Sequence, residues 1–158
     1  MTYLVLYMVA ILSGESYTAA LDFQFPGTNW CGPGASTSDY NSLGSNRDID
    51  LCCREHDHCD SVIDPGERKY GLYNDGSFTK SHCSCDDRFK MCLKSTDSFT
   101  GFLLGYFYFN TLKMKCFREE YPVIGCRRHR GLFSWKCTEP MYDMSRDKKY
   151  QFFDLQGY

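Results

Sequence analysis

The stretch CCREHDHC, residues 52–59, places three cysteines, two histidines and three charged residues in eight positions. These residue types serve three kinds of chemistry. Cysteine and histidine ligate zinc, paired cysteines cross-link secreted folds, and a histidine beside an aspartate can combine a general base with a cation ligand. Zinc is disfavoured, because its sites usually show separated ligand pairs and thiolate sites are uncommon in oxidised proteins. The purely structural and the catalytic interpretations both stay open at this point.

The spacing of the cysteines predicts the elements that hold this stretch. Cys52 and Cys59 are seven residues apart, and so are Cys85 and Cys92. Seven residues make about two helical turns, so each pair lies on one face of its helix. Two antiparallel helices can then be joined by the disulfides Cys52–Cys92 and Cys59–Cys85. The parallel pairing is disfavoured, because the connection between the helices is short.

The same register places His56 on the face of the first helix that meets the second helix, near Asp86. A carboxylate bonded to one imidazole nitrogen sets the tautomer and leaves the other nitrogen free as a base. Asp57 points to a different side of the helix and is available to a separate partner. The spacing therefore predicts a His–Asp pair across the seam between the two helices.

A second stretch, WCGPG at residues 30–34, offers oxygen ligands for a hard cation. Its glycines permit a curled loop in which alternate carbonyl oxygens converge. These carbonyls belong to Trp30, Gly32 and Gly34. Together with the Asp57 carboxylate they would form part of a calcium site, which takes six to eight oxygens. A disulfide from Cys31 would hold the loop beside the helix, where Cys53 is available, although a glycine-rich loop alone is a weak signal.

The composition indicates one secreted, disulfide-rich domain. The chain has 158 residues and 10 cysteines, an even number that is far above ordinary cytosolic usage. Residues 3–12 form an apolar run too short to span a bilayer, and small residues follow up to Ala20. We therefore predict a signal peptide at residues 1–20 and a single domain at residues 21–158. Secretion to the extracellular space agrees with the cysteine content, because disulfides persist in oxidising compartments.

The pattern of apolar and turn-forming residues predicts a mainly α-helical fold with a small β-hairpin. Helices are expected at residues 48–63, 83–95 and 99–116. Asp48 or Asp50 is expected to cap the first helix. The turn of the hairpin is expected at residues 74–76, Asn-Asp-Gly. After Pro122 we expect irregular chain with a short strand at residues 150–155.

Charge is distributed unevenly along the chain. Residues 21–112 contain 8 Lys and Arg against 13 Asp and Glu, whereas residues 113–158 contain 10 against 6. The basic C-terminal part favours an anionic membrane surface, although an ordinary solvated surface explains it equally well. An apolar stretch at residues 98–110 is expected to pack in the core rather than touch lipid. Its helically spaced side chains are Phe102, Leu103, Tyr106 and Phe109. No motif indicates nucleic-acid binding.

The segments WCGPG, CCREHDHC and CSCDDRFKMCL together resemble the secreted phospholipases A2, specifically the bee-venom (group III) type. Further shared segments are FPGTNWCG, GERKYGL, YFN, PVIGC and YQFFDL. The resemblance extends from Phe25 to the end of the chain. It implies the phospholipase A2 fold, in which two antiparallel disulfide-stapled helices lie beside a calcium-binding loop.

The resemblance also implies a role for each matching residue. His56 matches the catalytic base, Asp86 matches the aspartate that orients it, and Tyr108 matches a tyrosine that supports this aspartate. Calcium (Ca2+) is the implied cofactor. Its matching ligands are the backbone carbonyls of Trp30, Gly32 and Gly34 and the carboxylate of Asp57, with the Gly32 N–H as an oxyanion donor. The implied disulfides are Cys31–Cys53, Cys52–Cys92, Cys59–Cys85, Cys83–Cys116 and Cys126–Cys137.

The activity implied by the resemblance is calcium-dependent hydrolysis of the sn-2 ester of glycerophospholipids, with water activated by His56. The products are a free fatty acid and a lysophospholipid. We expect a monomer that acts at the phospholipid membrane surface. The alternative is a non-catalytic receptor-binding protein or toxin on the same scaffold. The enzyme is favoured, because such relatives usually lose the histidine or its neighbouring aspartate, and His56 and Asp57 are both present.

Overall fold

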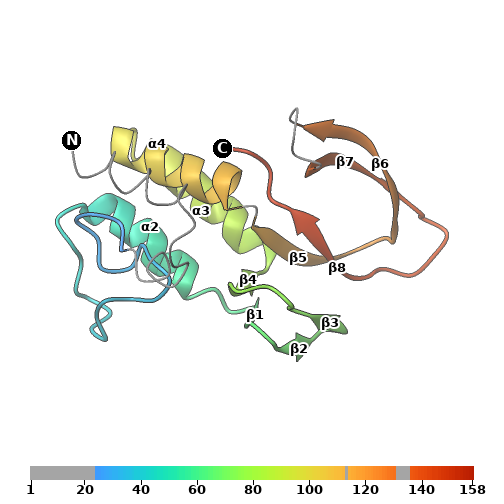
Figure 1. Ribbon diagram of the computed structural model, residues 1–158, viewed down its shortest axis with the longest axis horizontal. Helices are drawn as coiled ribbons and strands as arrows, with labels where there is room; N and C mark the ends of the chain where they lie inside the picture. The colour runs from blue at the N-terminus through green and yellow to red at the C-terminus, as the bar shows by residue number, and fades with distance from the viewer. Residues whose placement is uncertain (1–23, 113, 131–135) are drawn as a thin grey trace, which may run out of the picture.

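A computed structural model of the protein describes residues 24–112, 114–130 and 136–158. The predicted signal peptide at residues 1–20 lies outside these ranges. Figure 1 shows the α-helices together at one end of the molecule and the longest strands at the other. The elements are α2 (Arg47–Asp57), β1 (Val62–Ile63), β2 (Arg68–Lys69), β3 (Leu72–Tyr73), β4 (Lys80–Ser81), α3 (Cys83–Ser95), α4 (Phe99–Tyr106), the π-helix η1 (Phe107–Thr111), β5 (Lys115–Glu120), β6 (Val123–Arg130), β7 (Lys136–Tyr142) and β8 (Lys149–Asp154). Within the described residues, no helix is long and apolar enough to cross a bilayer.

Helices α2 and α3 form the stapled pair that the cysteine spacing predicts (Figure 1). Cys52 is bonded to Cys92 with a Cα–Cα distance of 5.6 Å, and Cys59 is bonded to Cys85 at 6.0 Å. This pairing requires antiparallel helices, so the predicted register is confirmed. The three other disulfides are also the ones that the resemblance implies, and no cysteine is free.

Helix α2 ends at Asp57, so the prediction of a helix up to residue 63 is wrong. Val62 and Ile63 instead form β1, which pairs with β4, and Ile63 is fully buried. Long-range pairing of these two β-branched residues therefore overrides the local helical pattern. The predicted aspartate cap is also wrong, because Asn46 holds the N-cap position and its side chain makes no capping hydrogen bond.

The third predicted helix stops earlier than expected. Helix α4 is capped by Ser98, whose hydroxyl accepts a hydrogen bond from the Gly101 N–H at 3.0 Å. It continues into η1 and then gives way to β5, which contains Cys116. The Cys83–Cys116 disulfide and the pairing of β5 with β8 fix this segment as a strand. The helical prediction for the last part of residues 99–116 is therefore wrong.

The hairpin between α2 and α3 turns at a different place from the predicted one. Strands β2 and β3 pair across Tyr70 and Gly71, which both have positive φ angles of 54° and 75°. Two positive φ angles are typical of the tight hairpin turn for which Asn-Gly is the usual signal. Asn74, expected in the turn, is fully buried and donates to the Ile63 and Phe78 carbonyl oxygens at 2.9 Å each.

The C-terminal part contains more β-structure than the sequence predicts. Strand β8 confirms the strand expected near residues 150–155, and it pairs with β5. Strands β6 and β7 form a second antiparallel ribbon with register shifts, where irregular chain was expected. Strand β6 lacks the alternating apolar pattern of a strand, so its pairing depends on its partner and on the Cys126–Cys137 bond. The fold is therefore helical around a stapled pair, but not mainly α-helical as a whole.

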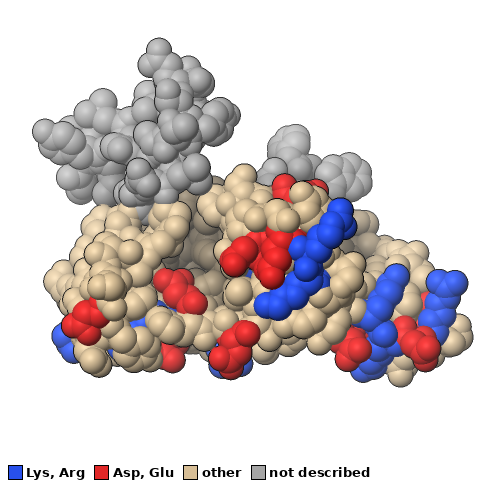
Figure 2. Space-filling model, turned by 90° about the horizontal axis from the view of Figure 1, so that it is seen from below, with Lys and Arg blue, Asp and Glu red and all other residues tan. Residues whose placement is uncertain are grey.

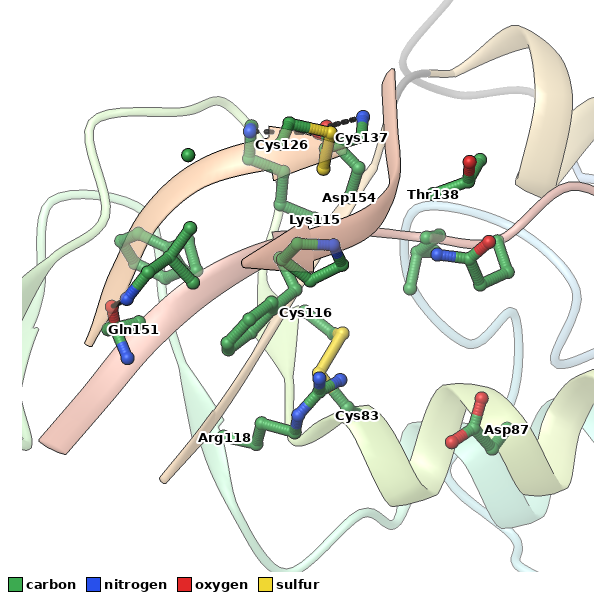
Figure 3. Close-up of a pocket in the computed structure, with 17 residues that line it drawn as sticks. Cys83, Asp87, Lys115, Cys116, Arg118, Cys126, Cys137, Thr138, Gln151 and Asp154 are labelled. Atoms are coloured by element: carbon green, nitrogen blue, oxygen red, sulfur yellow. Dashed lines mark hydrogen bonds and ion pairs between the residues drawn. A yellow bond between two sulfur atoms is a disulfide. The ribbon is translucent and has the colours of Figure 1, made fainter. Parts of the chain in front are cut away.

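Two surface features lie outside the seam between α2 and α3. A recess of about 610 Å³ lies between the β5–β8 and β6–β7 ribbons, beside the ion pair of Lys115 and Asp154 (Figure 3). None of the predicted catalytic or ligand residues lines it. Figure 2 shows basic and acidic side chains interspersed on one face, with most of the basic ones over the half that carries the ribbons. That face therefore carries no large patch of a single charge.

Candidate active site

Three predicted residues meet at the seam between the helices. His56 comes from α2, Asp86 from the first turn of α3, and Tyr108 from η1. The His56 Nε2 atom lies 3.0 Å from Asp86 Oδ1, and the Tyr108 hydroxyl donates to the same oxygen at 2.9 Å. The Asp86 residue is only 1% exposed, so this network is shielded from water.

The hydrogen bonds define which nitrogen of His56 can act as a base. Because Asp86 is an acceptor, Nε2 carries the proton and donates it, which leaves the lone pair on Nδ1 free. Burial, followed by the charge of Asp86 and the hydrogen bond to it, raises the pKa of Tyr108 well above its usual value. Tyr108 therefore stays a neutral donor to Asp86 at neutral pH.

An aromatic residue that the sequence analysis missed holds the histidine ring. Phe89 stacks on His56 with a centroid distance of 4.5 Å and an angle of 25° between the planes. Phe89 also meets the Tyr108 ring edge-on at 5.2 Å. Phe89 follows Asp86 by three residues on α3, so helical spacing could have placed it on the same face.

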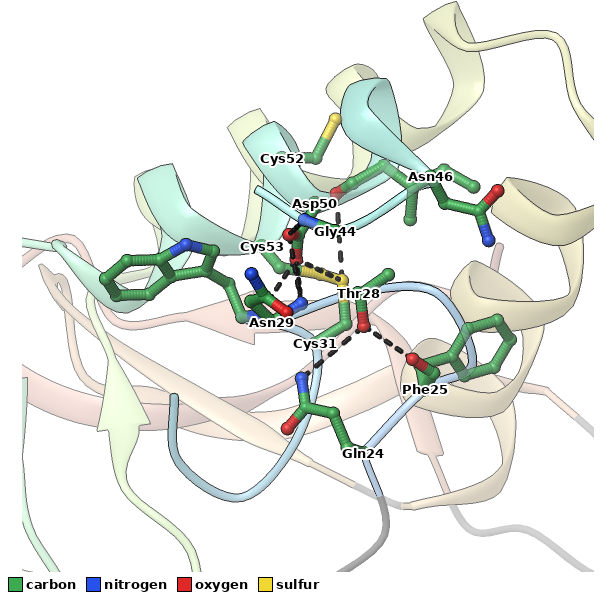
Figure 4. Close-up of a disulfide and its surroundings, with 12 residues drawn as sticks. Gln24, Phe25, Thr28, Asn29, Cys31, Gly44, Asn46, Asp50, Cys52 and Cys53 are labelled. Carbon is green, nitrogen blue, oxygen red and sulfur yellow. Dashed lines mark hydrogen bonds between the residues drawn. A yellow bond between two sulfur atoms is a disulfide. The ribbon is translucent and has the colours of Figure 1, made fainter. Parts of the chain in front are cut away.

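The WCGPG loop is fastened to α2 by a disulfide and by a buried carboxylate (Figure 4). Cys31 is bonded to Cys53, with a Cα–Cα distance of 5.2 Å. The Asp50 carboxylate, which is 0% exposed, accepts hydrogen bonds of 2.8 to 2.9 Å from three backbone N–H groups. These donors belong to Asn29, Trp30 and Gly44. The sequence pattern predicted Asp50 only as a possible helix cap, so this buried role is a finding of the structure.

A second contact brings the loop to the end of α2 that carries Asp57. The Trp30 ring lies 5.3 Å from the His58 ring, which also meets the Tyr40 ring edge-on at 5.0 Å. His58 is the residue directly after Asp57, so the start of the loop lies beside the predicted carboxylate ligand. The sequence analysis gave His58 no role, whereas the structure shows it as a packing residue between two aromatic rings.

Gly32 is exposed, but the Gln24 side chain lies close to the position that a Cβ atom would take. A Cβ atom at this position would collide with the Gln24 Oε1 atom, so no larger residue fits without a shift. The Gly32 N–H donates to the Trp30 carbonyl oxygen at 3.2 Å. Its use as an oxyanion donor would therefore require this contact to open.

Asp57 is the one predicted ligand with a charged side chain. The residue is exposed, yet the surrounding protein desolvates the carboxylate and raises its pKa to about 6, while His56 and His58 oppose this shift. Among the described residues, no side chain or backbone group donates a hydrogen bond to it. An ionised carboxylate of this kind is stabilised by a cation.

The residues present fit calcium better than zinc. All ten cysteines are consumed by disulfides, and the described residues contain no group of three His, Cys, Asp or Glu side chains that could hold a metal. A cation at Asp57 would therefore need backbone carbonyls, and hard oxygen donors of this kind suit calcium. The loop at residues 30–34 is the segment that the fold brings to this end of α2.

Helix α4 presents apolar side chains to solvent near the site. Phe102 is 51% exposed, Leu103 41% and Tyr106 53%, whereas Phe109 is 2% exposed. The expectation of core packing is therefore right for Phe109 and wrong for the other three. Phe99, at 75% exposed, extends the same helix surface.

Fold and site together define a disulfide-stapled protein with a histidine hydrogen-bonded to a buried aspartate. Comparison with known proteins agrees with that class. The sequence profile described as phospholipase A2 matches residues 24–120, more than half of the chain. The phospholipase A2 of Apis dorsata is 44% identical over 136 residues, covering 85% of this chain and 98% of that protein.

Two further relatives extend the comparison. The phospholipase A2 of Apis mellifera is 44% identical over 136 residues, covering 85% of this chain and 79% of that protein. The acidic phospholipase A2 PA4 of Heloderma suspectum is 44% identical over 117 residues, covering 74% of this chain and 80% of that protein. The chain therefore belongs to the phospholipase A2 family, in the group III branch that includes the bee enzymes.

Proposed function

We propose that this protein is a secreted, calcium-dependent phospholipase A2 that hydrolyses the sn-2 ester of glycerophospholipids. The observation that carries the proposal is the contact of His56, Asp86 and Tyr108, at 3.0 and 2.9 Å, within a member of this family. A histidine with one nitrogen bound to a buried carboxylate and the other free is the arrangement that a general base requires.

The proton steps follow from this arrangement. His56 Nδ1 takes a proton from a water molecule, whose oxygen attacks the carbonyl carbon of the sn-2 ester. When the tetrahedral intermediate collapses, the same imidazole returns the proton to the departing oxygen of the lysophospholipid. Asp86 stabilises the imidazolium between these steps through its 3.0 Å contact with Nε2. All ten cysteines are in disulfides, so no thiol nucleophile competes with water.

Calcium would be held by Asp57 and by the carbonyl oxygens of Trp30, Gly32 and Gly34, and when bound it would neutralise the phosphate and polarise the ester carbonyl. The support for this site is the carboxylate of Asp57, which accepts no hydrogen bond from the described residues, and the fastening of the loop to α2 through Asp50 and the Cys31–Cys53 bond. The Gly32 N–H is the proposed oxyanion donor.

The exposed side chains of α4 are proposed to dock on the phospholipid membrane surface. Four large apolar side chains lie within eight residues of one helix, and each apolar side chain that leaves water on docking contributes to binding. We further propose residues 1–20 as the signal peptide, residues 21–158 as the secreted domain, and the monomer as the active form.

The proposal is tested by measuring fatty-acid release from phosphatidylcholine vesicles, with calcium and with chelator. Release that depends on calcium, and that disappears in His56→Gln, is the expected result. Equal rates with and without calcium would exclude the calcium site. The absence of release by well-folded protein would favour the non-catalytic, receptor-binding alternative on the same scaffold.

A further inference from the structure

The residues at the C-terminal end of the described chain lie across the element that carries Tyr108. Residues 155–158 leave β8 and run back to the helices (Figure 1). Leu155 is 5% exposed and belongs to the same buried cluster as Phe89 and Phe109. None of these residues takes part in the proposed proton steps, so their contacts with the helices must serve a different purpose.

Three polar or charged contacts hold this segment in place. The Tyr158 N–H donates to the Asn110 Oδ1 atom at 3.2 Å, within η1. Lys90 of α3 donates to the Gln156 carbonyl oxygen at 3.2 Å. The Lys94 ammonium lies 5.3 Å from the centre of the Tyr158 ring, within cation–π range. The segment therefore joins α3 to η1, the two elements that supply Asp86 and Tyr108.

The Tyr158 ring packs directly against the backbone of Gly105 on α4, where any larger residue would collide with it. A Cβ atom at Gly105 would collide with Cε2 and Cζ of that ring. Gly105 is buried, and it lies in the last turn of α4 just before η1. A glycine in a helix interior costs about 1 kcal/mol relative to alanine, so its presence here is consistent with a need for close approach of the ring.

A chain of ring contacts runs from Tyr158 to the histidine. Tyr158 stacks on Phe109 with a centroid distance of 5.9 Å and an interplanar angle of 19°. Phe109 contacts Tyr108 at 4.9 Å and Phe89 at 6.0 Å, and Phe89 stacks on His56 at 4.5 Å. Displacement of Tyr158 therefore frees Phe109 to move, and with it the two rings that orient the Tyr108 hydroxyl and the imidazole.

The element that Tyr158 packs against, η1, is a π-helix and carries Tyr108. The Leu112 N–H bonds to the Phe107 carbonyl oxygen at 3.1 Å, in the wider i to i+5 pattern of a π-helix. Such turns are rare, and they occur frequently at functional sites. Lys136 donates to the Phe109 carbonyl oxygen at 2.7 Å, so a backbone oxygen of η1 is also held from outside the helix.

We propose that Tyr158 is a positioning residue of the active site, acting through Phe109 on Tyr108 and on His56. The proposal rests on the proposed function, because it assigns Tyr158 to the network that would activate water. It predicts an effect on kcat and not on calcium binding, since the loop at residues 30–34 is fastened to α2 by other groups.

The test compares two variants that displace the ring by different means. Tyr158→Ala removes the ring, and Gly105→Ala pushes it from its seat while favouring the helix. Each is expected to lower kcat about tenfold on a dispersed short-chain phosphatidylcholine, with KM and the calcium affinity unchanged, because small misplacement of catalytic groups is costly. Tyr158→Phe keeps the ring and is expected to retain wild-type kcat.

Tyr150→Ala is the matched control. Tyr150 lies in β8 and stacks on Tyr70 at 4.7 Å, so its loss removes a comparable ring contact outside the chain of rings to His56. Wild-type kcat in this control supports the proposal. The proposal is overturned if Tyr150→Ala lowers kcat as much as Tyr158→Ala does. It is also overturned if the kcat of Tyr158→Ala stays within about twofold of wild type.

Two further measurements separate positioning from mere stability. In a Tyr108→Phe background, loss of the Tyr158 ring is expected to have a smaller effect than in the wild type, because coupled residues are non-additive. Full additivity would place the action of Tyr158 elsewhere. In NMR spectra, exchange of the His56 Nε2 proton is expected to speed up in Tyr158→Ala and not in Tyr150→Ala. This second readout needs no turnover, so it tests the positioning role even if the proposed activity fails.

Discussion

The helical end and the ribbon end of this molecule are cross-linked in the same way but use their cross-links differently. Between α2 and α3, two disulfides flank the contact of His56 with Asp86, which is 1% exposed. In the β6–β7 ribbon, the Cys126–Cys137 disulfide joins two strands whose residues are mostly half-buried or exposed. The two disulfides between the helices therefore fix the register of a buried seam, whereas the disulfide of the ribbon closes a structure at the surface.

The largest expected effect lies at the seam. His56→Gln removes the base and preserves the size of the side chain, so we expect kcat to fall by about 10²- to 10⁴-fold, the usual contribution of a general base. The measurement is fatty-acid release from a dispersed phosphatidylcholine. The matched change in the ribbon, His129→Gln, is expected to leave kcat unchanged, and a comparable loss there would remove the functional difference between the two ends.

Removal of one disulfide from each end should separate stability from activity. The Cys52–Cys92 bond closes a separation of 40 residues and the Cys126–Cys137 bond one of 11. Loop-closure entropy predicts losses in free energy of unfolding of about 4 and about 3 kcal/mol for the paired serine variants. Denaturant titration measures both losses. Activity of the folded protein should fall only in Cys52→Ser/Cys92→Ser, and an equal fall in Cys126→Ser/Cys137→Ser would contradict the comparison.

We expect calcium binding at Asp57, which lies at the helical end, to depend on pH. Because the pKa of Asp57 is raised to about 6, a proton competes with the cation below that pH. We expect the calcium affinity to fall by up to about tenfold per pH unit below pH 6, as isothermal titration calorimetry would show. An affinity that stays constant down to pH 5 would exclude Asp57 as a ligand.

The raised pKa of Asp57 also makes the stability of the folded protein depend on pH. The folded pKa of about 6 lies above the ordinary value of 3.8, so for this group the folded state binds more protons than the unfolded state. The calcium-free protein should therefore gain stability from Asp57 as the pH falls from 6 toward 4. Asp57→Asn should remove this gain, and thermal unfolding without calcium measures it.

The smallest expected effect concerns membrane docking. Phe99 on α4 is 75% exposed, and Met144 between β7 and β8 is 73% exposed. Phe99→Ser is expected to weaken vesicle binding several-fold, because partial burial of a Phe side chain is worth about 1 kcal/mol. Activity on dispersed substrate should not change. Met144→Ser is the control at the ribbon end, and an equal weakening there would show that docking does not depend on α4.

The contact between His56 and Asp86 could be predicted from the sequence because it depends on helical spacing. Two cysteine pairs with a helical spacing of seven fix both the faces and the register of α2 and α3, and His56 and Asp86 follow from that register. The glycine-rich loop at residues 30–34 could also be recognised from the sequence. The role of Asp50 was not predicted, because the backbone N–H groups that it binds come from a distant part of the chain. Phe89 shares a helix face with Asp86, but its stacking on His56 depends on the packing of two helices.

The sequence by itself determined the cross-linked helices, the dyad between them and the family, since helical periodicity and cysteine spacing are properties of the neighbouring residues. Only the tertiary structure decided where α2 and α4 end, where the hairpin turns at Tyr70, and that residues 123–130 and 136–142 pair as a ribbon. Tertiary packing also placed Tyr158 on Gly105 and Phe109. The physical reason is that strand pairing and ring stacking join residues far apart in the chain, so their stabilisation has no signature in local periodicity.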